Sequence, residues 1–414
     1  MRASDETSLT CRFCGSQLTT SFADLGETPL ANSYLTAPDQ ADPHYPLHAR
    51  VCDSCLLVQV EDVVTAEEIF SDYAYFSSFS TSWVAHAETY TKMATERFSL
   101  DASSSVIEVA SNDGYLLQHF MKAGIPVLGI EPAANVAQTA NANGVPTLAE
   151  FFGLKFAQTL HEKGMRADLL LGNNVLAHVP DLNDFVAGLA CLLADDGVLT
   201  MEFPHLARLI EDAQFDTIYH EHFSYFSLLV VEKVFTRHGL YLFDVEELPT
   251  HGGSLRIFAA RRDGPQRTEG VGLRKVRDDE VAMGLYRRDG YAGFQSRVEA
   301  IRDGVQAFLG ETKRAGKTVA AYGAAAKGNT LLNFCGVDAS QIDFVADISD
   351  QKQGRFLPGS RIPIVAPDRL RDSRPDYVLI LPWNLKREIT VAHDHIADWG
   401  GRFVVALPEL TILS

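Results

Sequence analysis

The chain has 414 residues, of which 46% are hydrophobic and 22% are charged, and its formal net charge is −18. That length exceeds what one hydrophobic core supports, so we expect two or three globular domains. The acidic balance disfavours a nucleic-acid partner, which requires basic surface to displace counterions from phosphates. The sequence has no signal-like or membrane-spanning apolar run, which indicates a cytoplasmic protein with no membrane partner.

Four cysteines near the N-terminus form two Cys-x-x-Cys pairs, Cys11 with Cys14 and Cys52 with Cys55. Each pair places two thiolates on one tight turn, and two such turns can surround a soft divalent cation. Two redox dithiols or disulfides are the alternative interpretation. Four thiolates leave no open coordination position, so the pattern predicts a structural zinc site that does no chemistry itself.

An aromatic and hydroxyl-rich segment, 73–80, comes next and leads into an expected helix over 83–98. From residue 106 short apolar runs alternate with helical periods, which is typical of a parallel α/β sheet. The expected strands are 106–110, 127–131, one that starts with 169–171, and 198–203. A hairpin over 241–246 and 254–260 then gives the outline of a class I methyltransferase sheet.

The first strand of this region ends in the turn Ala110-Ser-Asn-Asp-Gly114, and Glu131 ends the next strand. Ligands of α/β sheets bind at the carboxyl ends of strands, where an acidic residue can accept both hydroxyls of a ribose. Ala110 and Asn112 stand where a methyltransferase motif usually has glycine, so the turn suits a nucleoside without phosphates better than a dinucleotide. Glu108 suits the cationic amino group of S-adenosylmethionine, directly or through water. A strand–turn–helix without a ligand is the alternative.

Two polar stretches follow later strands of the same sheet. His178 lies just past a strand end, where active-site residues gather, although a core or capping histidine is the alternative. The stretch Ile218-Tyr-His-Glu-His-Phe-Ser-Tyr225 is the densest cluster of titratable side chains in the chain. Histidine ordinarily has a pKa near the operating pH, and Glu221 can orient or tune His222, which favours a proton-transfer site over a metal site or a surface turn.

A polar stretch at about 262–280 indicates a domain boundary, and a long helical region runs from it to Gly316. A second α/β alternation follows, with strands expected over 318–322, 344–347, 377–382 and 402–407. Its first turn, Tyr322-Gly-Ala-Ala-Ala-Lys-Gly328, combines a helix N-terminus with Lys327 and so can hold an anion or pyrophosphate. Asn384 ends another strand and is expected in the same crevice. Glycines for close helix–sheet packing are the alternative.

Seven motifs in one order resemble the bacterial nucleotide-sugar C-methyltransferases that branch deoxysugars at C3. They are the two Cys-x-x-Cys pairs, Tyr73-Ala-Tyr-Phe-Ser, Glu108-Val-Ala-Ser-Asn-Asp-Gly114, Asn174-Val-Leu-Ala-His178, Tyr219-His-Glu-His222, His251-Gly-Gly-Ser254 and Tyr322-Gly-Ala-Ala-Ala-Lys-Gly328. The resemblance covers nearly the whole chain. It implies an α/β protein with a zinc-binding module (1–82), a Rossmann-like S-adenosylmethionine domain (83–262) and a doubly wound α/β domain (263–414) that helps to hold the nucleotide-sugar.

The resemblance also implies a reaction and its site residues. The expected substrate is a nucleotide-linked 4-keto-deoxysugar, whose C3 proton is removed to give an enolate that takes the methyl group, in a monomer or small homo-oligomer. The residues expected in catalysis are His222, Tyr219, Glu221, His178 and Tyr73. The residues expected to bind S-adenosylmethionine are Glu108, Ala110, Asn112, Gly114, Glu131, Pro132, Asn173 and Asn174. The residues expected to bind the substrate are Tyr75, Ser77, Tyr225, His251, Tyr322, Lys327, Asn329 and Asn384.

Four other functions are weighed against this one. O- or N-methylation of a nucleotide-sugar needs no carbon acid and is the nearest alternative. An NAD-dependent oxidoreductase would use the turn 323–328 with Asp347, but this turn lacks the paired early glycines of a dinucleotide fingerprint. A zinc-ribbon methyltransferase acting on RNA is disfavoured by the net charge, and one acting on protein by the missing macromolecule-binding stripe. A scaffold without activity leaves the cluster 219–225 unexplained.

Overall fold

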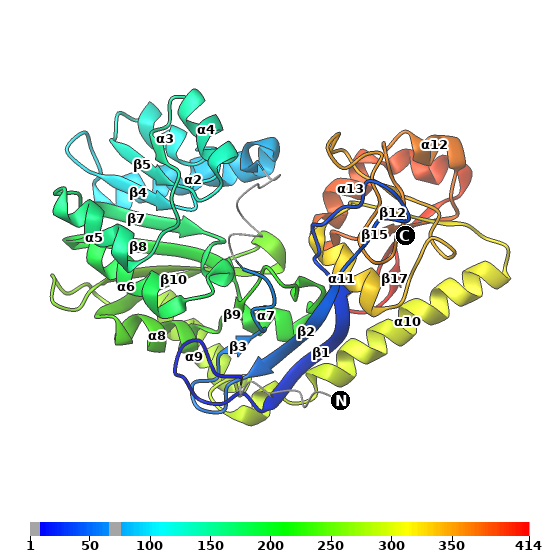
Figure 1. Ribbon diagram of the computed structural model, residues 1–414, viewed down its shortest axis with the longest axis horizontal. Helices are drawn as coiled ribbons and strands as arrows, with labels where there is room; N and C mark the ends of the chain where they lie inside the picture. The colour runs from blue at the N-terminus through cyan, green and yellow to red at the C-terminus, as the bar shows by residue number, and fades with distance from the viewer. Residues whose placement is uncertain (1–8, 66–75, 414) are drawn as a thin grey trace.

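The computed structural model describes residues 9–65 and 76–413, arranged around three β-sheets (Figure 1). Tyr73 and Tyr75 therefore lie outside the described residues. No helix in the part of the chain that the structure describes is both long and apolar enough to cross a membrane.

The first sheet is antiparallel and is built from two distant parts of the chain. Its strands are β1 (Thr20–Pro29), β2 (His44–Val51), β3 (Val58–Gln59) and β9 (Ser224–Tyr225), in the order β1-β2-β3-β9. In β2, Leu47, Ala49 and Val51 are buried and alternate with more exposed residues, as expected for a strand with one face on a core. Because β9 belongs to the middle of the chain, the N-terminal module is completed by a strand from its neighbour.

The middle sheet has seven strands in the order β10-β11-β8-β7-β4-β5-β6. They are β4 (Val106–Val109), β5 (Val127–Ile130), β6 (Thr147–Leu148), β7 (Ala167–Asn173), β8 (Leu193–Pro204), β10 (Leu240–Leu248) and β11 (Ser254–Arg261). All neighbours are parallel except β11, which pairs antiparallel with both β8 and β10. The expected class I methyltransferase outline with a terminal hairpin is confirmed.

Helices cover both faces of this sheet (Figure 1). Those on one face are α2 (Thr81–Phe98), α3 (Leu117–Lys122) and α4 (Ala134–Ala142); those on the other are α5 (Leu154–Glu162), α6 (Leu182–Leu192) and α8 (Leu228–Arg237). Leu169 and Leu171 of β7 pack with the first group, whereas Leu170 packs with the second. This alternation is the two-residue period of a strand buried on both faces.

The third sheet has the order β14-β13-β12-β15-β16-β17. Its strands are β12 (Val319–Tyr322), β13 (Val345–Ala346), β14 (Ile364–Val365), β15 (Tyr377–Ile380), β16 (Arg402–Val405) and the antiparallel β17 (Thr411–Ile412). Its helices include α11 (Ala326–Phe334), α12 (Arg369–Ser373) and α13 (Lys386–Ala392). The chain order around the central β12 is that of a doubly wound sheet, so the predicted fold class is confirmed.

Further contacts among the described residues join the third sheet to the rest of the protein. Helices α9 (Val271–Ala282) and α10 (Phe294–Arg314) link the middle sheet to the third, and Phe294 stacks on Phe22 of β1 with ring centroids 4.5 Å apart. The segment between β1 and β2 reaches the third sheet, where Leu35 forms a β-bridge with Phe356. The β1–β2 hairpin therefore lies between the two larger sheets (Figure 1), and their facing edges form the candidate active site.

Candidate active site between the three sheets

The four predicted metal ligands come together in one cluster. The Sγ atoms of Cys11, Cys14, Cys52 and Cys55 all lie within 4.8 Å of one another. The Cys11–Cys55 and Cys14–Cys52 sulfur pairs are each 3.5 Å apart, too far for a disulfide bond of about 2 Å. A tetrahedral zinc with Zn–S bonds of about 2.3 Å has sulfur–sulfur edges of about 3.8 Å. The cluster therefore fits zinc and contradicts the disulfide alternative.

The two cysteine turns have the backbone that such a site requires. Gly15 (φ 75°) donates its N–H to the Cys11 carbonyl at 2.9 Å, and Leu56 (φ 71°) donates to the Cys52 carbonyl at 2.8 Å. Gln59 of β3 donates from Nε2 to the Cys11 sulfur at 3.2 Å, a contact that suits a thiolate. The cysteine turns are thus tied directly to the strand that pairs with β9.

The turn after β4 has an unusual backbone. Ala110 (φ 56°) and Asn112 (φ 49°) adopt the left-handed conformation that glycine provides without strain, and such outliers cluster at functional sites. A Cβ on Gly114 would lie 2.7 Å from a methyl group of Val145, so this glycine cannot be replaced without a shift. Glu131 holds the turn, because its carboxylate accepts the N–H of Asn112 at 2.9 Å and that of Ala133 at 3.0 Å. Each carboxylate oxygen keeps a lone pair for a ribose hydroxyl.

Glu108 stands beneath this turn as a buried acid. It is 0% exposed, and neither of its carboxylate oxygens has a hydrogen-bond partner among the described residues. Burial, together with the nearby carboxylates of Glu131 and Asp113, raises its pKa well above the usual value. A buried carboxyl group without a partner is costly unless a ligand completes it, and a cationic amino group would do so. The Asn174 amide oxygen is likewise buried without a partner in the described part.

His222 is fixed by two hydrogen bonds. Its Nδ1 lies 2.8 Å from the Thr217 carbonyl and its Nε2 lies 2.8 Å from the Tyr219 hydroxyl. A carbonyl only accepts, so Nδ1 carries the proton and Nε2 is the lone-pair nitrogen that accepts from Tyr219. The His178 ring lies edge-on, with centroids 4.7 Å apart. Burial lowers the pKa of both histidines, that of His178 to about 4, and the His178 charge lowers that of His222 further.

Glu221 points to a different partner from the one that its position in the sequence suggests. Its Oε1 accepts the side-chain N–H of Asn32 at 2.7 Å, and burial raises its pKa to about 7. Asn32 comes from the segment between β1 and β2, and sequence reasoning missed it because one asparagine beside a turn carries no chemical signature. Of the two residues expected to orient His222, Tyr219 is the one that hydrogen-bonds its ring.

The third sheet contributes a half-buried lysine. Lys327, near the start of α11, donates to the Asn384 amide oxygen at 2.8 Å and lies 4.7 Å from the Trp383 ring centroid. Burial lowers its pKa, an effect that Asp216 opposes. Asp216, which accepts the Trp383 indole N–H at 2.7 Å, has a pKa raised to about 6 by burial. The charge of Lys327 also lowers the pKa of His222, so the two groups lie close enough to interact electrostatically.

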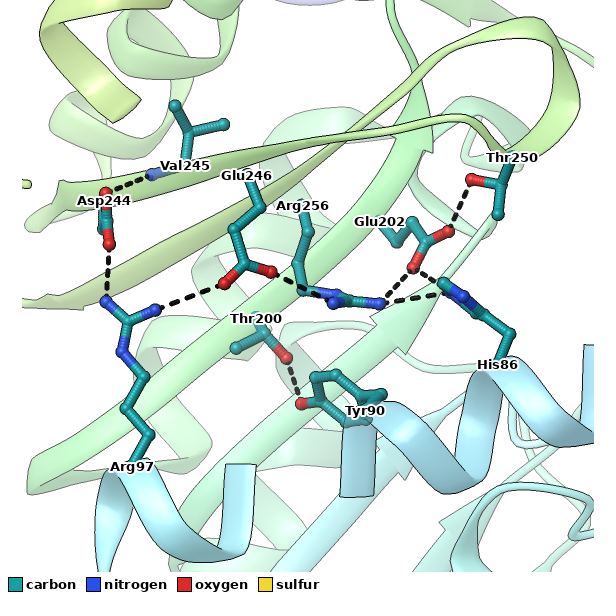
Figure 2. A network of polar contacts seen from close by, with 10 residues as sticks. All are labelled: His86, Tyr90, Arg97, Thr200, Glu202, Asp244, Val245, Glu246, Thr250 and Arg256. Carbon is teal, nitrogen blue, oxygen red and sulfur yellow. Dashed lines mark hydrogen bonds and ion pairs between the residues drawn. The ribbon is translucent and has the colours of Figure 1, made fainter. Parts of the chain in front are cut away.

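A polar network holds helix α2 against the edge of the middle sheet (Figure 2). Buried Glu202 of β8 accepts from Thr250 at 2.9 Å and from Arg256 at 2.9 Å, and lies 2.9 Å from Nε2 of His86. Next along the chain from Thr250, His251 lies 3.1 Å from the Asn174 amide, so two predicted site residues meet here. Sequence reasoning missed this network because its members are distant in the chain.

Of the remaining predicted residues, two lie near the turn after β4 or near His222, and two make contacts with other segments. The Ser77 N–H donates to the Asn112 amide oxygen at 2.8 Å, so the segment before α2 rests on the turn after β4. Tyr225 is buried in β9 with its ring 6.2 Å from that of His222. Asn329 donates instead to the Ala31 carbonyl at 2.5 Å, which holds the β1–β2 segment. Tyr322 packs against His393 within the third sheet, with ring centroids 4.6 Å apart.

Comparison with known proteins agrees with this architecture. The chain is 36% identical over 406 residues to the C-methyltransferase NovU of Streptomyces niveus, and the match covers 98% of this chain and 96% of NovU. The protein belongs to the C-methyltransferase family. Within this C-methyltransferase, family models match a zinc binding domain at 11–70, a methyltransferase domain at 83–245 and a C-methyltransferase C-terminal domain at 249–408. The predicted cofactors, S-adenosylmethionine and zinc, are those of its methyltransferase and zinc binding domains.

Other similarities to the C-methyltransferase are partial. The ubiquinone biosynthesis O-methyltransferase of Bartonella quintana is 26% identical over 95 residues, which is 23% of this chain and 38% of that protein. The crystal structure of the PH0226 protein of Pyrococcus horikoshii OT3 matches 47% of this chain and 97% of its own, with a TM-score of 0.38 and 14% identity.

Proposed function

We propose that the protein transfers a methyl group from S-adenosylmethionine to C3 of a nucleotide-linked 4-keto-deoxysugar. The observation that carries the proposal is the His222–Tyr219 pair, a neutral imidazole whose lone-pair nitrogen accepts from a phenol in a buried site. A sugar carbon attacks a methyl group only after it loses a proton. Oxygen and nitrogen nucleophiles need no such carbon acid, so a buried base beside the donor site favours C-methylation.

The proposed reaction starts with proton removal from the substrate. A 4-keto group acidifies the neighbouring C3–H. Before substrate binds, the Tyr219 hydroxyl orients the imidazole by donating to Nε2 of His222. In the proposed reaction that hydroxyl turns to the substrate oxygen, which frees the Nε2 lone pair to take the C3 proton, and the resulting enolate carbon attacks the methyl group in line. Tyr219 and His178 are proposed to hydrogen-bond the oxygen that gains charge. Such a bond contributes about 3–4 kcal/mol in a preorganised site. When bound, S-adenosylmethionine supplies an electrophilic methyl group, and Glu108, Glu131 and the turn 110–114 would hold it.

The substrate is proposed to lie across the gap between the middle and third sheets. Lys327 is a half-buried cation near the N-terminus of α11, and both the cation and the helix N-terminus attract the negative charge of a nucleotide diphosphate. Asn384 orients the ammonium group. The proposed placement brings the sugar toward His222 and His178, since α11 contacts the segment before His222, where Thr330 donates to the Ile218 carbonyl at 3.1 Å. Tyr225 and His251 are proposed to complete the pocket with the segment around Ser77.

The reaction is tested with labelled S-adenosylmethionine and a panel of 4-keto nucleotide-sugars that carry deuterium at C3. We expect a methylated product by mass spectrometry that has lost the C3 deuterium. Matched sugars with a hydroxyl in place of the 4-keto group should not react, because their C3–H is not acidic. A methylated product that keeps its deuterium would show O- or N-methylation and contradict the proposal.

Replacement of Glu108 by glutamine should weaken donor binding while leaving the fold intact. The amide keeps the size of the side chain but removes its charge, and a hydrogen bond to a charged group contributes about 1.5–3 kcal/mol. We therefore expect the Kd for S-adenosylmethionine to rise by about 10–100-fold in isothermal titration calorimetry. Glu88→Gln, an exposed acid on α2, is the matched control. An unchanged Kd in Glu108→Gln would remove Glu108 from the donor site.

A further inference from the structure

Arg12 lies between the first two zinc ligands, yet its side chain leaves the cysteine cluster. Its side chain is 8% exposed, and its guanidinium group makes three hydrogen bonds to other segments. One terminal nitrogen donates to the Pro180 carbonyl at 3.0 Å. The other donates to the Val60 carbonyl at 2.6 Å and to the Asp62 carboxylate at 2.8 Å. A charged group this deeply buried, whose two terminal nitrogens make three hydrogen bonds to other segments, fixes the relative positions of those segments.

Two of these segments lead directly to the histidine pair. Pro180 lies two residues after His178 in the same loop, so the hydrogen bond from Arg12 to the Pro180 carbonyl holds this loop on the C-terminal side of His178. Val60 donates its N–H to the Phe223 carbonyl at 3.1 Å, and Phe223 follows His222. The Arg12 guanidinium carbon also lies 5.3 Å from the Phe223 ring centroid. A single side chain therefore contacts the neighbours of both histidines.

The backbone of the same turn is held equally closely. The Arg12 N–H donates to the Gln59 amide oxygen at 2.9 Å, and the Gln59 amide nitrogen donates to the Cys11 sulfur at 3.2 Å. The Asn183 side chain donates to the carbonyls of Arg12 and Phe13, both at 3.0 Å. The path from the cysteine cluster to the histidine loops is thus continuous and consists of hydrogen bonds whose partners lie far apart in the chain.

We propose that Arg12 is a positioning residue that sets the distance and angle between His178 and His222. The first cysteine turn then belongs to the framework of the active site, although its metal lies outside the reacting groups. The catalytic consequence rests on the proposed function, because it assumes that the two imidazoles act on the substrate. The geometric consequence does not, since the rings lie 4.7 Å apart and at 70° in the protein itself.

The test compares Arg12→Met and Arg12→Lys with Arg50→Met. Arg50 is an arginine of β2 in the same module, and its ion pair with Glu61, at 3.7 Å, does not involve the histidine loops. Nitrogen-15 NMR of histidine-labelled protein reports the rings, with His178→Asn and His222→Asn used to assign their signals. Zinc content, donor affinity and turnover are measured on the same samples.

In Arg12→Met we expect full zinc content, an unchanged Kd for S-adenosylmethionine, shifted signals of both rings and a fall in kcat. Misplacement of reacting groups by about 1 Å costs about 10²-fold, so a fall of about 10–100-fold is expected. Arg12→Lys should recover part of kcat, because it keeps the charge but loses the planar fork of donors. Arg50→Met should match the wild type.

Unmoved ring signals with normal kcat in Arg12→Met would overturn the inference, as would equal changes in Arg50→Met. If Arg12→Met loses zinc, Arg12→Lys decides: moved ring signals at full zinc content support the inference and unmoved ones refute it. A further outcome is that the wild type methylates no 4-keto nucleotide-sugar while the ring signals still move only in the Arg12 variants. That result would refute the proposed function but would support the positioning role of Arg12.

Discussion

Replacement of His222 by asparagine should lower turnover by about 10²–10⁴-fold, the usual contribution of a general base. Asparagine can keep a hydrogen bond to the Thr217 carbonyl but has no lone-pair nitrogen to take the C3 proton. Donor affinity should barely change, because the turn after β4 and Glu108 hold S-adenosylmethionine elsewhere. Steady-state kinetics with the 4-keto substrate and calorimetry with the donor alone measure the two effects separately.

His178→Asn is the matched variant for this experiment, since the two imidazoles lie side by side and are both half-buried. It should lower turnover less, because it removes a hydrogen bond to the charged oxygen and not the base. Near wild-type turnover in His222→Asn, with a large loss in His178→Asn, would reverse the two roles.

The pH dependence offers a second view of the same assignment. Burial lowers the pKa of His222 below 6.5, so the neutral form that can accept a proton predominates above that lowered pKa. We therefore expect kcat/KM to stay flat from pH 8 to below 6.5 and to fall only at lower pH, where His222 becomes protonated. The pKa of Glu221 is raised to about 7, so a fall in rate centred near pH 7 would instead identify Glu221 as the base.

Removal of zinc should destroy the N-terminal sheet and abolish turnover. A structural zinc contributes about 10–16 kcal/mol to the folding of small zinc domains, which is more than most domains have in total. The cysteine turns carry β3, β3 pairs with β9, and β9 follows His222 directly. Loss of the metal should therefore unfold the sheet that contains β9 and so displace His222.

Metal analysis of the purified protein should give about one zinc per chain. Chelation should raise amide hydrogen exchange in β1–β3 and β9 while the third sheet stays protected. Cys52→Ser should behave like the chelated protein, whereas Cys191→Ser, which changes a free thiol outside the cluster, should keep both zinc and turnover. A metal-free protein with full turnover and four titratable thiols in the cluster would refute the structural zinc.

Most strands of the middle and third sheets could be predicted from the sequence because they are apolar and separated by helical periods. The strands β6, β14 and β17 were not predicted, since two residues are too short for a periodic signal. The hairpin β10–β11 was predicted from Gly252-Gly253 between two alternating segments, and the structure pairs them antiparallel. The four cysteines were equally visible, because two short spacings define a zinc site without knowledge of the fold.

The sheet β1-β2-β3-β9 could not be predicted in full. β3 and β9 have two residues each, which is too short for any periodic signal, and they pair across more than half of the middle domain. The contact between Asn32 and Glu221 depends on that pairing. The same is true of Arg12, which in the sequence is only a residue between two cysteines. Side chains whose roles arise from distant contacts carry no local signature.

The pairing of β3 with β9 also determines when the N-terminal module can be finished during synthesis. The edge of β3 at Val58 stays unpaired until Tyr225 has left the ribosome. At a synthesis rate of about 5–20 residues per second, this delay is roughly 10–30 s. An uncovered edge is a template for wrong association. Early zinc capture by the four cysteines would keep the nascent hairpin folded through that interval, so zinc supply is expected to govern the yield of newly made protein.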